Sequence, residues 1–109
     1  MKQFDIYRNA GKNRVTIPYV VVVQSSCYRK SRRRVVVPLI LAEELGKITD
    51  LPKSGINPLF IIEGVNVVLS PLDIVSVPIE SLGVWVGSLA EDGDVIVAAL
   101  DELFSRAWG

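Results

Sequence analysis

The chain has 109 residues, half of them hydrophobic, and its formal net charge at pH 7 is zero. This length supports a single domain, residues 1–109, with a core that needs no disulfide, and the high content of Val, Leu and Ile excludes a disordered protein. Cys27 has no second cysteine to pair with, and the absence of histidine excludes Ser-His-Asp and Cys-His catalysis. We therefore expect no catalytic residues, no bound metal and no cofactor.

Charge is distributed unevenly along the chain. The first 34 residues carry nine basic side chains and one acidic one, whereas the rest carry three basic and eleven acidic. This asymmetry indicates a charged partner, or self-association through opposite patches. No apolar run approaches the roughly 18 residues of a membrane span, and the start of the chain lacks a signal-peptide pattern. We expect a cytoplasmic protein that has no contact with a membrane.

Alternating and β-branched runs, separated by glycine, proline and polar clusters, predict six or so short strands. On the first strand, Phe4 and Ile6 are expected to face inward. Pro18 removes a ladder donor from the second strand, which predicts an edge position or a bulge. The run 20–23 is apolar on both faces and is expected to be covered on both sides. The strands are expected at residues 4–8, 14–24, 35–37, 59–62, 65–69, 74–78 and 83–87.

The segments between these strands predict loops, one hairpin turn and one short helix. Pro38 is expected to end the third strand, and the leucine spacing predicts a short helix over 42–47. Glu63-Gly64 joins two β-rich runs and predicts a hairpin. Residues 25–34 are predicted to form a long basic loop, whose charges are either simply solvated or bind an anion such as a phosphate or an acidic peptide.

The segment 88–109 has the clearest helical period in the chain. Ser88 and Glu91 fit a capping box at its start, and Gly93 opposes the helix by about 1 kcal/mol. Trp108 lies at the edge of the apolar stripe, where it either packs into the core or contacts a partner. The stripe comprises Ile96, Leu100, Leu103, Phe104 and Ala107. Together the elements predict a mainly β fold, a small antiparallel sheet or SH3-like barrel with a C-terminal α-helix.

Several short motifs occur along nearly the whole chain in a definite order. They are an opening Gln3-Phe4-x-Ile6-Tyr7, Val23-Gln24-Ser25 before a loop, Arg33-Arg34-Val35-Val36-Val37-Pro38-Leu39 after it, Asn57-Pro58 with an apolar strand, Ser76-Val77-Pro78, and a helix ending near Trp108-Gly109. In this order and spacing they resemble the CcdB family, the toxins of bacterial toxin–antitoxin modules.

The resemblance implies a homodimeric, non-enzymatic toxin with a CcdB-like fold. Such a toxin binds the A subunit of DNA gyrase and stabilises the gyrase–DNA cleavage complex, which produces double-strand breaks. A CcdA-like antitoxin neutralises it with a disordered tail that folds on binding. Operator DNA is then a partner only through the toxin–antitoxin complex, which represses its own operon.

The resemblance also implies which residues contact gyrase. In the family the contact is a C-terminal Trp-Gly-Ile with support from the loop after Gln-Ser. This chain lacks the terminal Ile, its helix is longer past the acidic start, and its loop is more basic. The longer helix brings Phe104 to one of the family's end positions. The implied gyrase-binding residues are Trp108, Gly109, Phe104, Ser25, Cys27 and Tyr28.

The basic segments predict where an antitoxin binds. We expect an acidic, partly disordered tail to contact them through charge complementarity. The predicted contacts are Arg8, Arg14, Arg32, Arg33 and Arg34. Cys27, beside Arg29 and Lys30, is either a small apolar loop residue or a reactive thiol.

Two alternative functions remain open at this point. The absence of the terminal Ile favours a CcdB-like dimeric binding module that has lost toxicity. The basic N-terminal third suits RNA, as in an endoribonuclease of the MazF type, although cleavage would then have to proceed without histidine.

Overall fold

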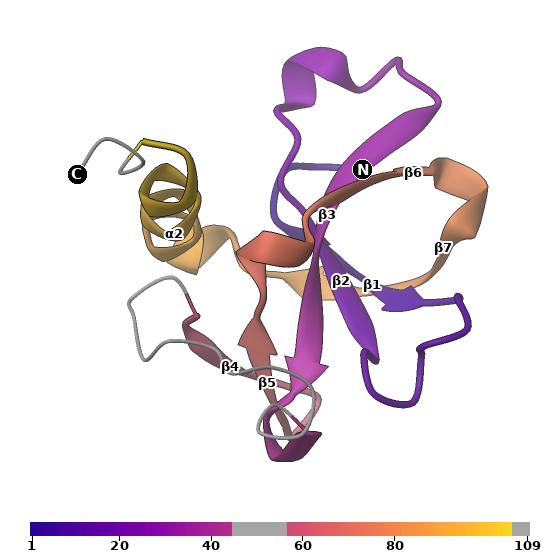
Figure 1. The fold of residues 1–109 in the computed structure, drawn as a ribbon. Helices are drawn as coiled ribbons and strands as arrows, with labels where there is room; N and C mark the ends of the chain where they lie inside the picture. The colour runs from indigo at the N-terminus through magenta and orange to yellow at the C-terminus, as the bar shows by residue number, and fades with distance from the viewer. Residues whose placement is uncertain (45–56, 106–109) are drawn as a thin grey trace.

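The computed structural model of the chain describes residues 1–44 and 57–105, in which one antiparallel sheet packs against one helix (Figure 1). This arrangement confirms the predicted fold class, mainly β with a C-terminal helix. The strands are β1 (Asp5–Asn9), β2 (Tyr19–Val22), β3 (Arg33–Leu41), β4 (Leu59–Ile62), β5 (Val65–Leu69), β6 (Val75–Pro78) and β7 (Leu82–Ser88), and the helix is α2 (Gly93–Ser105).

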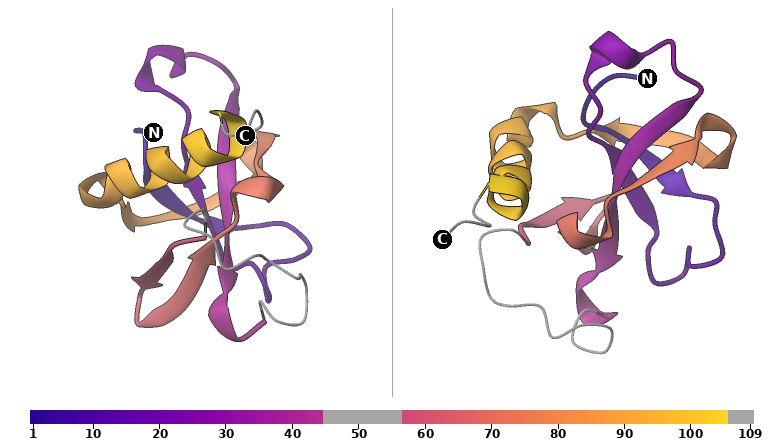
Figure 2. Two further views of the ribbon diagram at one scale, coloured as in Figure 1. Left: turned by 60° about the vertical axis from the view of Figure 1, so that its left-hand side comes forward. Right: turned by 45° about the horizontal axis from the view of Figure 1, so that its top comes forward.

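The sheet is organised around β3, which is nine residues long. The strands follow the spatial order β4-β5-β3-β2-β1-β7, and β6 pairs with the first part of β3. Along one side β3 pairs with β2, and along the other it pairs first with β6 and then with β5. Because one long strand serves three neighbours, the sheet curls into a half-barrel (Figure 2).

The main core lies between the sheet and α2. Ile96 and Ala99 stand three residues apart on one face of α2 and are fully buried against strand residues such as Leu39. Val20 and Val22 belong to a smaller cluster on the other face of the sheet. All four residues of β2 are therefore buried, which confirms for residues 20–22 the expectation that this run is covered on both faces.

The strand predicted over residues 14–24 is wrong in its first half. Residues 12–16 form turns, in which the N–H groups of Thr16 and Ile17 donate to the Asn13 carbonyl at 3.1 and 2.7 Å. The Asn9 side chain also holds this segment, since its amide donates to the Ile17 carbonyl at 2.8 Å. β2 begins only after Pro18, which has no N–H to donate to a ladder.

The expectation that Pro38 ends a strand is also wrong, because β3 runs through it. The Pro38 carbonyl accepts from the Ser70 N–H at 3.0 Å, on the side of β5 and β6. The nitrogen and carbonyl of one strand residue point to the same side, so the missing donor lies on that side too. There the ladder passes from β6, which ends opposite Val36, to β5, which begins opposite Leu39. The proline thus occupies the one gap in the pairing where no donor is needed.

The hairpin predicted at Glu63-Gly64 is confirmed, and it joins β4 to β5. Both turn residues have positive φ, 51° and 78°, as a two-residue hairpin loop of the favoured hand requires. The strands predicted at 74–78 and 83–87 correspond to β6 and β7, of which β7 is longer than expected. The predicted helix over 42–47 is a 3-10 turn at Ala42–Glu44, and its remaining residues lie outside the described part of the chain.

The C-terminal helix starts later than its sequence pattern predicts. The Ser88 hydroxyl accepts from the Ala90 N–H at 3.1 Å, not from Glu91, and a 3-10 turn precedes α2. Gly93 is therefore the first residue of α2 rather than an interior one. Phe4, expected on the first strand, precedes β1 with a φ of 71°, and its ring packs beside Gly93.

Replacing Gly93 by alanine is expected to destabilise the protein despite the better helix propensity of alanine. The added Cβ would lie 2.8 Å from Cε2 of the Phe4 ring, so the ring or the helix must shift. Overpacking of this kind costs about 1–3 kcal/mol, against a propensity gain of at most about 1 kcal/mol. Chemical denaturation measures the difference. Gly87→Ala is the control, because nothing lies within 4 Å of its added Cβ, and equal stability of the two variants would contradict the prediction.

Candidate functional site

Three of the predicted contact residues lie on the loop between β2 and β3, hereafter the β2–β3 loop (residues 23–32). Ser25 precedes a 3-10 turn, Ser26–Tyr28, and its hydroxyl accepts from the Cys27 N–H at 3.2 Å. Cys27 is an exposed free thiol, and Tyr28 is 66% exposed. The turn therefore presents a hydroxyl, a thiol and a phenol outward on one short stretch of backbone.

Ser25 and Tyr28 also share a shallow hollow of about 400 Å³ at the base of this loop. Val23 and Val35, from the strands on either side, give it an apolar floor. The rim consists of hydroxyl and amide groups, which suits a partner side chain that is partly apolar. The residues that line the hollow are Val23, Gln24, Ser25, Tyr28, Ser31 and Val35.

The helical part of the predicted contact lies on a different element. Phe104 is 62% exposed on α2, which stands apart from the β2–β3 loop in Figure 1. Trp108 and Gly109 lie outside the described residues, so the prediction for them is untested. Sequence reasoning also treated Trp85 simply as part of an apolar strand. It lies on β7 and is 56% exposed.

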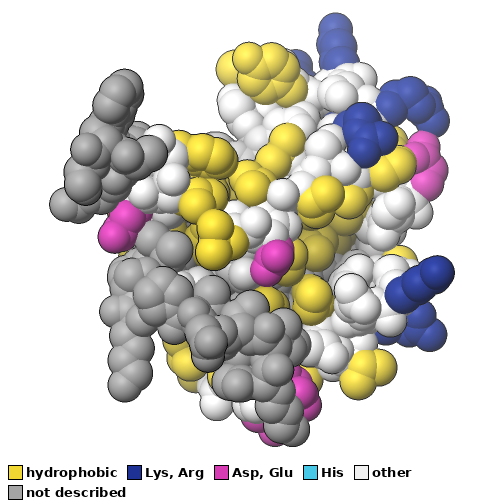
Figure 3. Space-filling model, viewed as in Figure 1, with side chains coloured by type: hydrophobic (Ala, Val, Ile, Leu, Met, Phe, Trp, Pro, Cys, Tyr) yellow, Lys and Arg dark blue, Asp and Glu magenta, His cyan; other side chains and the backbone are white. Residues whose placement is uncertain are grey.

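The arginines predicted to meet an acidic partner differ in exposure. Arg32 and Arg33 are exposed: Arg32 pairs with Glu80 at 2.8 Å, and Arg33 Nε donates to the Ser76 hydroxyl at 2.9 Å. Arg34 is only 6% exposed, and its guanidinium donates to backbone carbonyls of the loop. In Figure 3, Lys and Arg side chains gather along the upper and right-hand edge of this face, while hydrophobic side chains occupy its middle.

Arg8 takes part in a cluster that ties the β4–β5 hairpin to β1 and β2. Its Nη2 contacts both Glu63 carboxylate oxygens at 2.8 and 3.0 Å, and its guanidinium lies 5.8 Å from the centre of the Tyr19 ring. The Tyr19 hydroxyl donates to Glu63 Oε1 at 2.6 Å. Burial, with a further contribution from Glu63, raises the pKa of Tyr19 above its ordinary value. This cluster holds the curled sheet closed, and it leaves the Arg8 charge already paired.

The raised pKa of Tyr19 predicts an alkaline loss of stability. Its folded pKa exceeds the value of about 10 for an unfolded tyrosine, so its contribution is complete below pH 10 and disappears as the pH rises through the folded pKa. Tyr19→Phe is expected to lose about 1 kcal/mol at neutral pH, with its hydrogen bond, and to show a smaller further loss above pH 10. Urea denaturation from pH 7 to 11 measures both. Identical alkaline slopes in the two proteins would count against the assignment.

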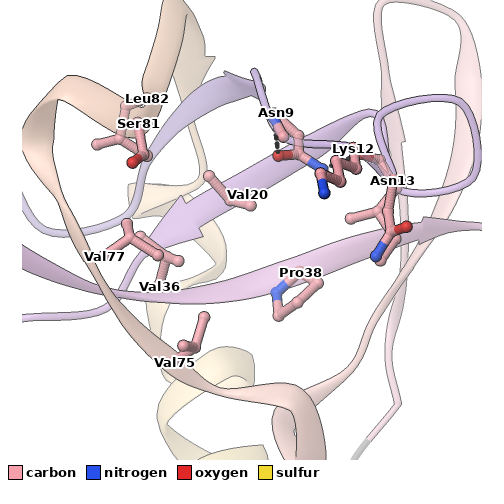
Figure 4. Close-up of a pocket in the computed structure, with 12 residues that line it drawn as sticks. Asn9, Lys12, Asn13, Val20, Val36, Pro38, Val75, Val77, Ser81 and Leu82 are labelled. Atoms are coloured by element: carbon pink, nitrogen blue, oxygen red, sulfur yellow. Dashed lines mark hydrogen bonds between the residues drawn. The ribbon is translucent and has the colours of Figure 1, made fainter.

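A pocket of about 310 Å³ opens on the other side of the sheet from α2 (Figure 4). Asn9, Lys12 and Asn13 stand on one side of it and Ser81 with Leu82 on the other, with apolar strand residues between. Lys12 is the one charged side chain in its lining, and the Arg14 guanidinium donates to the carbonyl of Gly11, another lining residue, at 3.3 Å. The site thus joins an apolar floor to a cationic rim. The apolar floor is formed by Ile17, Val20, Val36, Pro38, Val75, Val77 and Leu82.

Two further observations apply to residues 1–44 and 57–105. Within them no three His, Cys, Asp or Glu side chains gather as the ligands of a metal ion would. None of their helices is long and apolar enough to cross a membrane.

Two solved structures resemble the fold. An endoribonuclease in complex with its cognate antitoxin from a Mycobacterial species is 14% identical, with a TM-score of 0.73, and the match covers 100% of this chain and 99% of that chain. The Mycobacterium tuberculosis toxin MazF-mt6 is 15% identical, with a TM-score of 0.64 and coverage of 79% and 84%. At such low identity the likeness shows the fold alone.

The sequence itself gives a more specific relationship. No curated protein matches the chain. The profile of the family described as CcdB protein matches residues 3–105, which includes β1 to β7 and the whole of α2. With the fold and the ordered motifs in agreement, the chain belongs to the CcdB protein family.

Proposed function

We propose that this protein is the toxin of a bacterial toxin–antitoxin module, and that it acts by binding the DNA gyrase A subunit and stabilising the gyrase–DNA cleavage complex. The match of the CcdB family over residues 3–105 carries this proposal. Gyrase supplies the bond-breaking chemistry in this mechanism, so the toxin needs surfaces rather than catalytic groups. The active form is a cytoplasmic homodimer, which sedimentation equilibrium would test.

The exposure of the predicted contact residues supports a binding role. Tyr28 and Phe104 are 66% and 62% exposed, although both are aromatic, and aromatic side chains are enriched among the anchors of protein interfaces. Ser25 borders the hollow beside Tyr28. Trp108 and Gly109 complete the proposed contact at the end of the chain.

We further propose that the antitoxin contributes an acidic, CcdA-like tail. One structural neighbour is a toxin in complex with its cognate antitoxin, which supports a partner of this class. The pocket beside Lys12 offers room for an apolar side chain next to a cation, and Arg14, Arg32 and Arg33 extend the positive charge. The toxin–antitoxin complex would then bind operator DNA and regulate its own transcription.

Reversing the charge of Arg32 and Arg33 to glutamate is expected to weaken binding of the antitoxin encoded beside this protein by about tenfold or more at low salt. Both side chains are exposed, so the fold tolerates the change. Arg34 is left intact because it is buried. Titration calorimetry from low to high salt measures the affinity. An affinity that responds neither to salt nor to the reversal would exclude a charge-driven contact here.

Cleavage of RNA is the second candidate function, because one structural neighbour is an endoribonuclease. The only ionisable side chain lining the pocket of Figure 4 is that of Lys12, which offers little for general acid–base catalysis. We therefore place gyrase first and RNA second. A non-toxic binding module is the third reading.

One experiment separates these functions. Purified gyrase is incubated with plasmid DNA and ATP, with and without the protein, and protein-linked double-strand breaks are counted. The protein alone is incubated in parallel with single-stranded RNA. Breaks without RNA cleavage are the expected result. RNA cleavage without breaks would favour the endoribonuclease, and a folded protein inactive in both reactions would favour the binding module.

A further inference from the structure

Arg34 is the one charged side chain among the described residues that is buried, at 6% exposure. Its guanidinium faces the β2–β3 loop. Nη2 donates to the Arg29 carbonyl at 2.7 Å, and Nη1 donates to the carbonyls of Ser31 and Arg33. A planar group with five fixed donors suits three carbonyls that approach from different directions.

Gln24 performs a similar task from the other end of the loop. Its Oε1 accepts from the Val35 N–H at 3.0 Å, and its Nε2 donates to the Tyr28 carbonyl at 3.1 Å. One side chain from each flanking strand therefore reaches the loop backbone. Between them they hold the carbonyls of Tyr28, Arg29 and Ser31, the part of the loop that carries the exposed phenol.

Core stability does not explain why an arginine is kept here. Removing a guanidinium from water is costly, and apolar replacements of buried charges are often neutral or stabilising. The groups that Arg34 satisfies belong to a surface loop, not to the core between the sheet and α2. What the arginine provides is a fixed loop shape, and a fixed loop loses less conformational freedom when a partner binds.

We infer that Arg34 and Gln24 are positioning residues, which hold the β2–β3 loop in the shape that presents Tyr28 and Ser25 to the partner. This rests on the proposed function, in which the partner is the gyrase A subunit. Neither side chain touches the partner itself. Their effect on binding passes through Tyr28, and this distinguishes positioning from a general contribution to stability.

The first test needs no partner. Amide hydrogen exchange is measured for Tyr28, Arg29 and Ser31, whose N–H groups donate to the carbonyls of Ser25, Ser26 and Tyr28. In Arg34→Gln these amides are expected to exchange about tenfold faster, while the amides of β3 keep their protection. Lys30→Gln removes a positive charge from the same loop and is the control, with little change expected. Equal exchange in Arg34→Gln and the control would overturn the inference.

The second test measures affinity for a gyrase A fragment as a double-mutant cycle. Arg34→Gln is expected to weaken binding about fivefold or more in the native background and less than about twofold when Tyr28 is already alanine. The same loss in both backgrounds would mean a purely structural role and would overturn the inference. Gln24→Leu repeats the cycle, which keeps the test decisive where Arg34→Gln fails to fold.

The two proposals fail in different ways. Absence of gyrase binding by the folded native protein would refute the proposed function and, with it, the partner named here. Native binding that Arg34→Gln and Gln24→Leu both leave intact would refute only the positioning roles.

Discussion

Trp108→Ala is expected to reduce gyrase-dependent DNA breakage by about 30-fold or more. Buried aromatic anchors of interfaces typically contribute 2 kcal/mol or more when truncated to alanine, and about 2 kcal/mol corresponds to a factor of roughly 30 in affinity. In the proposed contact Trp108 is the largest side chain, and the absence of a following isoleucine leaves it without the family's apolar neighbour. The assay counts protein-linked breaks at a series of toxin concentrations.

The chain provides a matched control in Trp85. It is 56% exposed on β7, it is equally aromatic, and no proposed contact uses it. Trp85→Ala is expected to keep breakage within about threefold of the native protein, as surface changes away from a site usually do. If both variants lose activity alike, the effect is a loss of folding. If Trp108→Ala keeps full activity, the C-terminus is not the anchor.

Much of the architecture was predictable because its signals are local. The period of α2 follows from Ile96 and its neighbours, and the hairpin at Glu63-Gly64 follows from two β-rich runs separated by two residues. Burial on both faces of β2 follows from consecutive valines. In each case residues close in sequence determine the outcome, and no distant contact overrules them.

The errors arose where a distant contact decides the outcome. Pro38 fits inside β3 because β6 hands over to β5 beside it, and Gly93 begins α2 because the Phe4 ring lies against it. Neither neighbour is near in sequence. Local rules for proline and glycine describe what a residue costs in isolation, whereas the fold supplies positions at which that cost disappears.

The candidate site was predictable in part, and mainly through the family resemblance. The motif around Ser25 identifies the loop, and the exposure of Tyr28 agrees with a contact role. Arg34 could not be distinguished from Arg32 and Arg33, since three successive arginines look equivalent in sequence. The curl of the loop is what buries the third guanidinium, and no local pattern encodes it.

Ile96→Ala is expected to cause the largest loss of stability, about 2–5 kcal/mol. Ile96 is completely buried where α2 meets the sheet, in the same cluster as Leu39 and Leu69. Truncation removes apolar burial and leaves a cavity that surrounding strands cannot close. For a domain of this size each kcal/mol lowers the Tm by about 4–8 °C, so thermal and urea unfolding both resolve the change.

Val97→Ala is the matched control for Ile96→Ala, because the two neighbours on α2 are both β-branched and differ in burial. Val97 is 43% exposed, and alanine has the higher helix propensity, so a change within about 0.5 kcal/mol is expected. Equal losses in the two variants would mean that α2 is not anchored through Ile96. The comparison also bears on function: Phe104 lies on α2 and the chain continues from it to Trp108, so weaker anchoring of α2 should reduce DNA breakage at temperatures where Val97→Ala remains fully active.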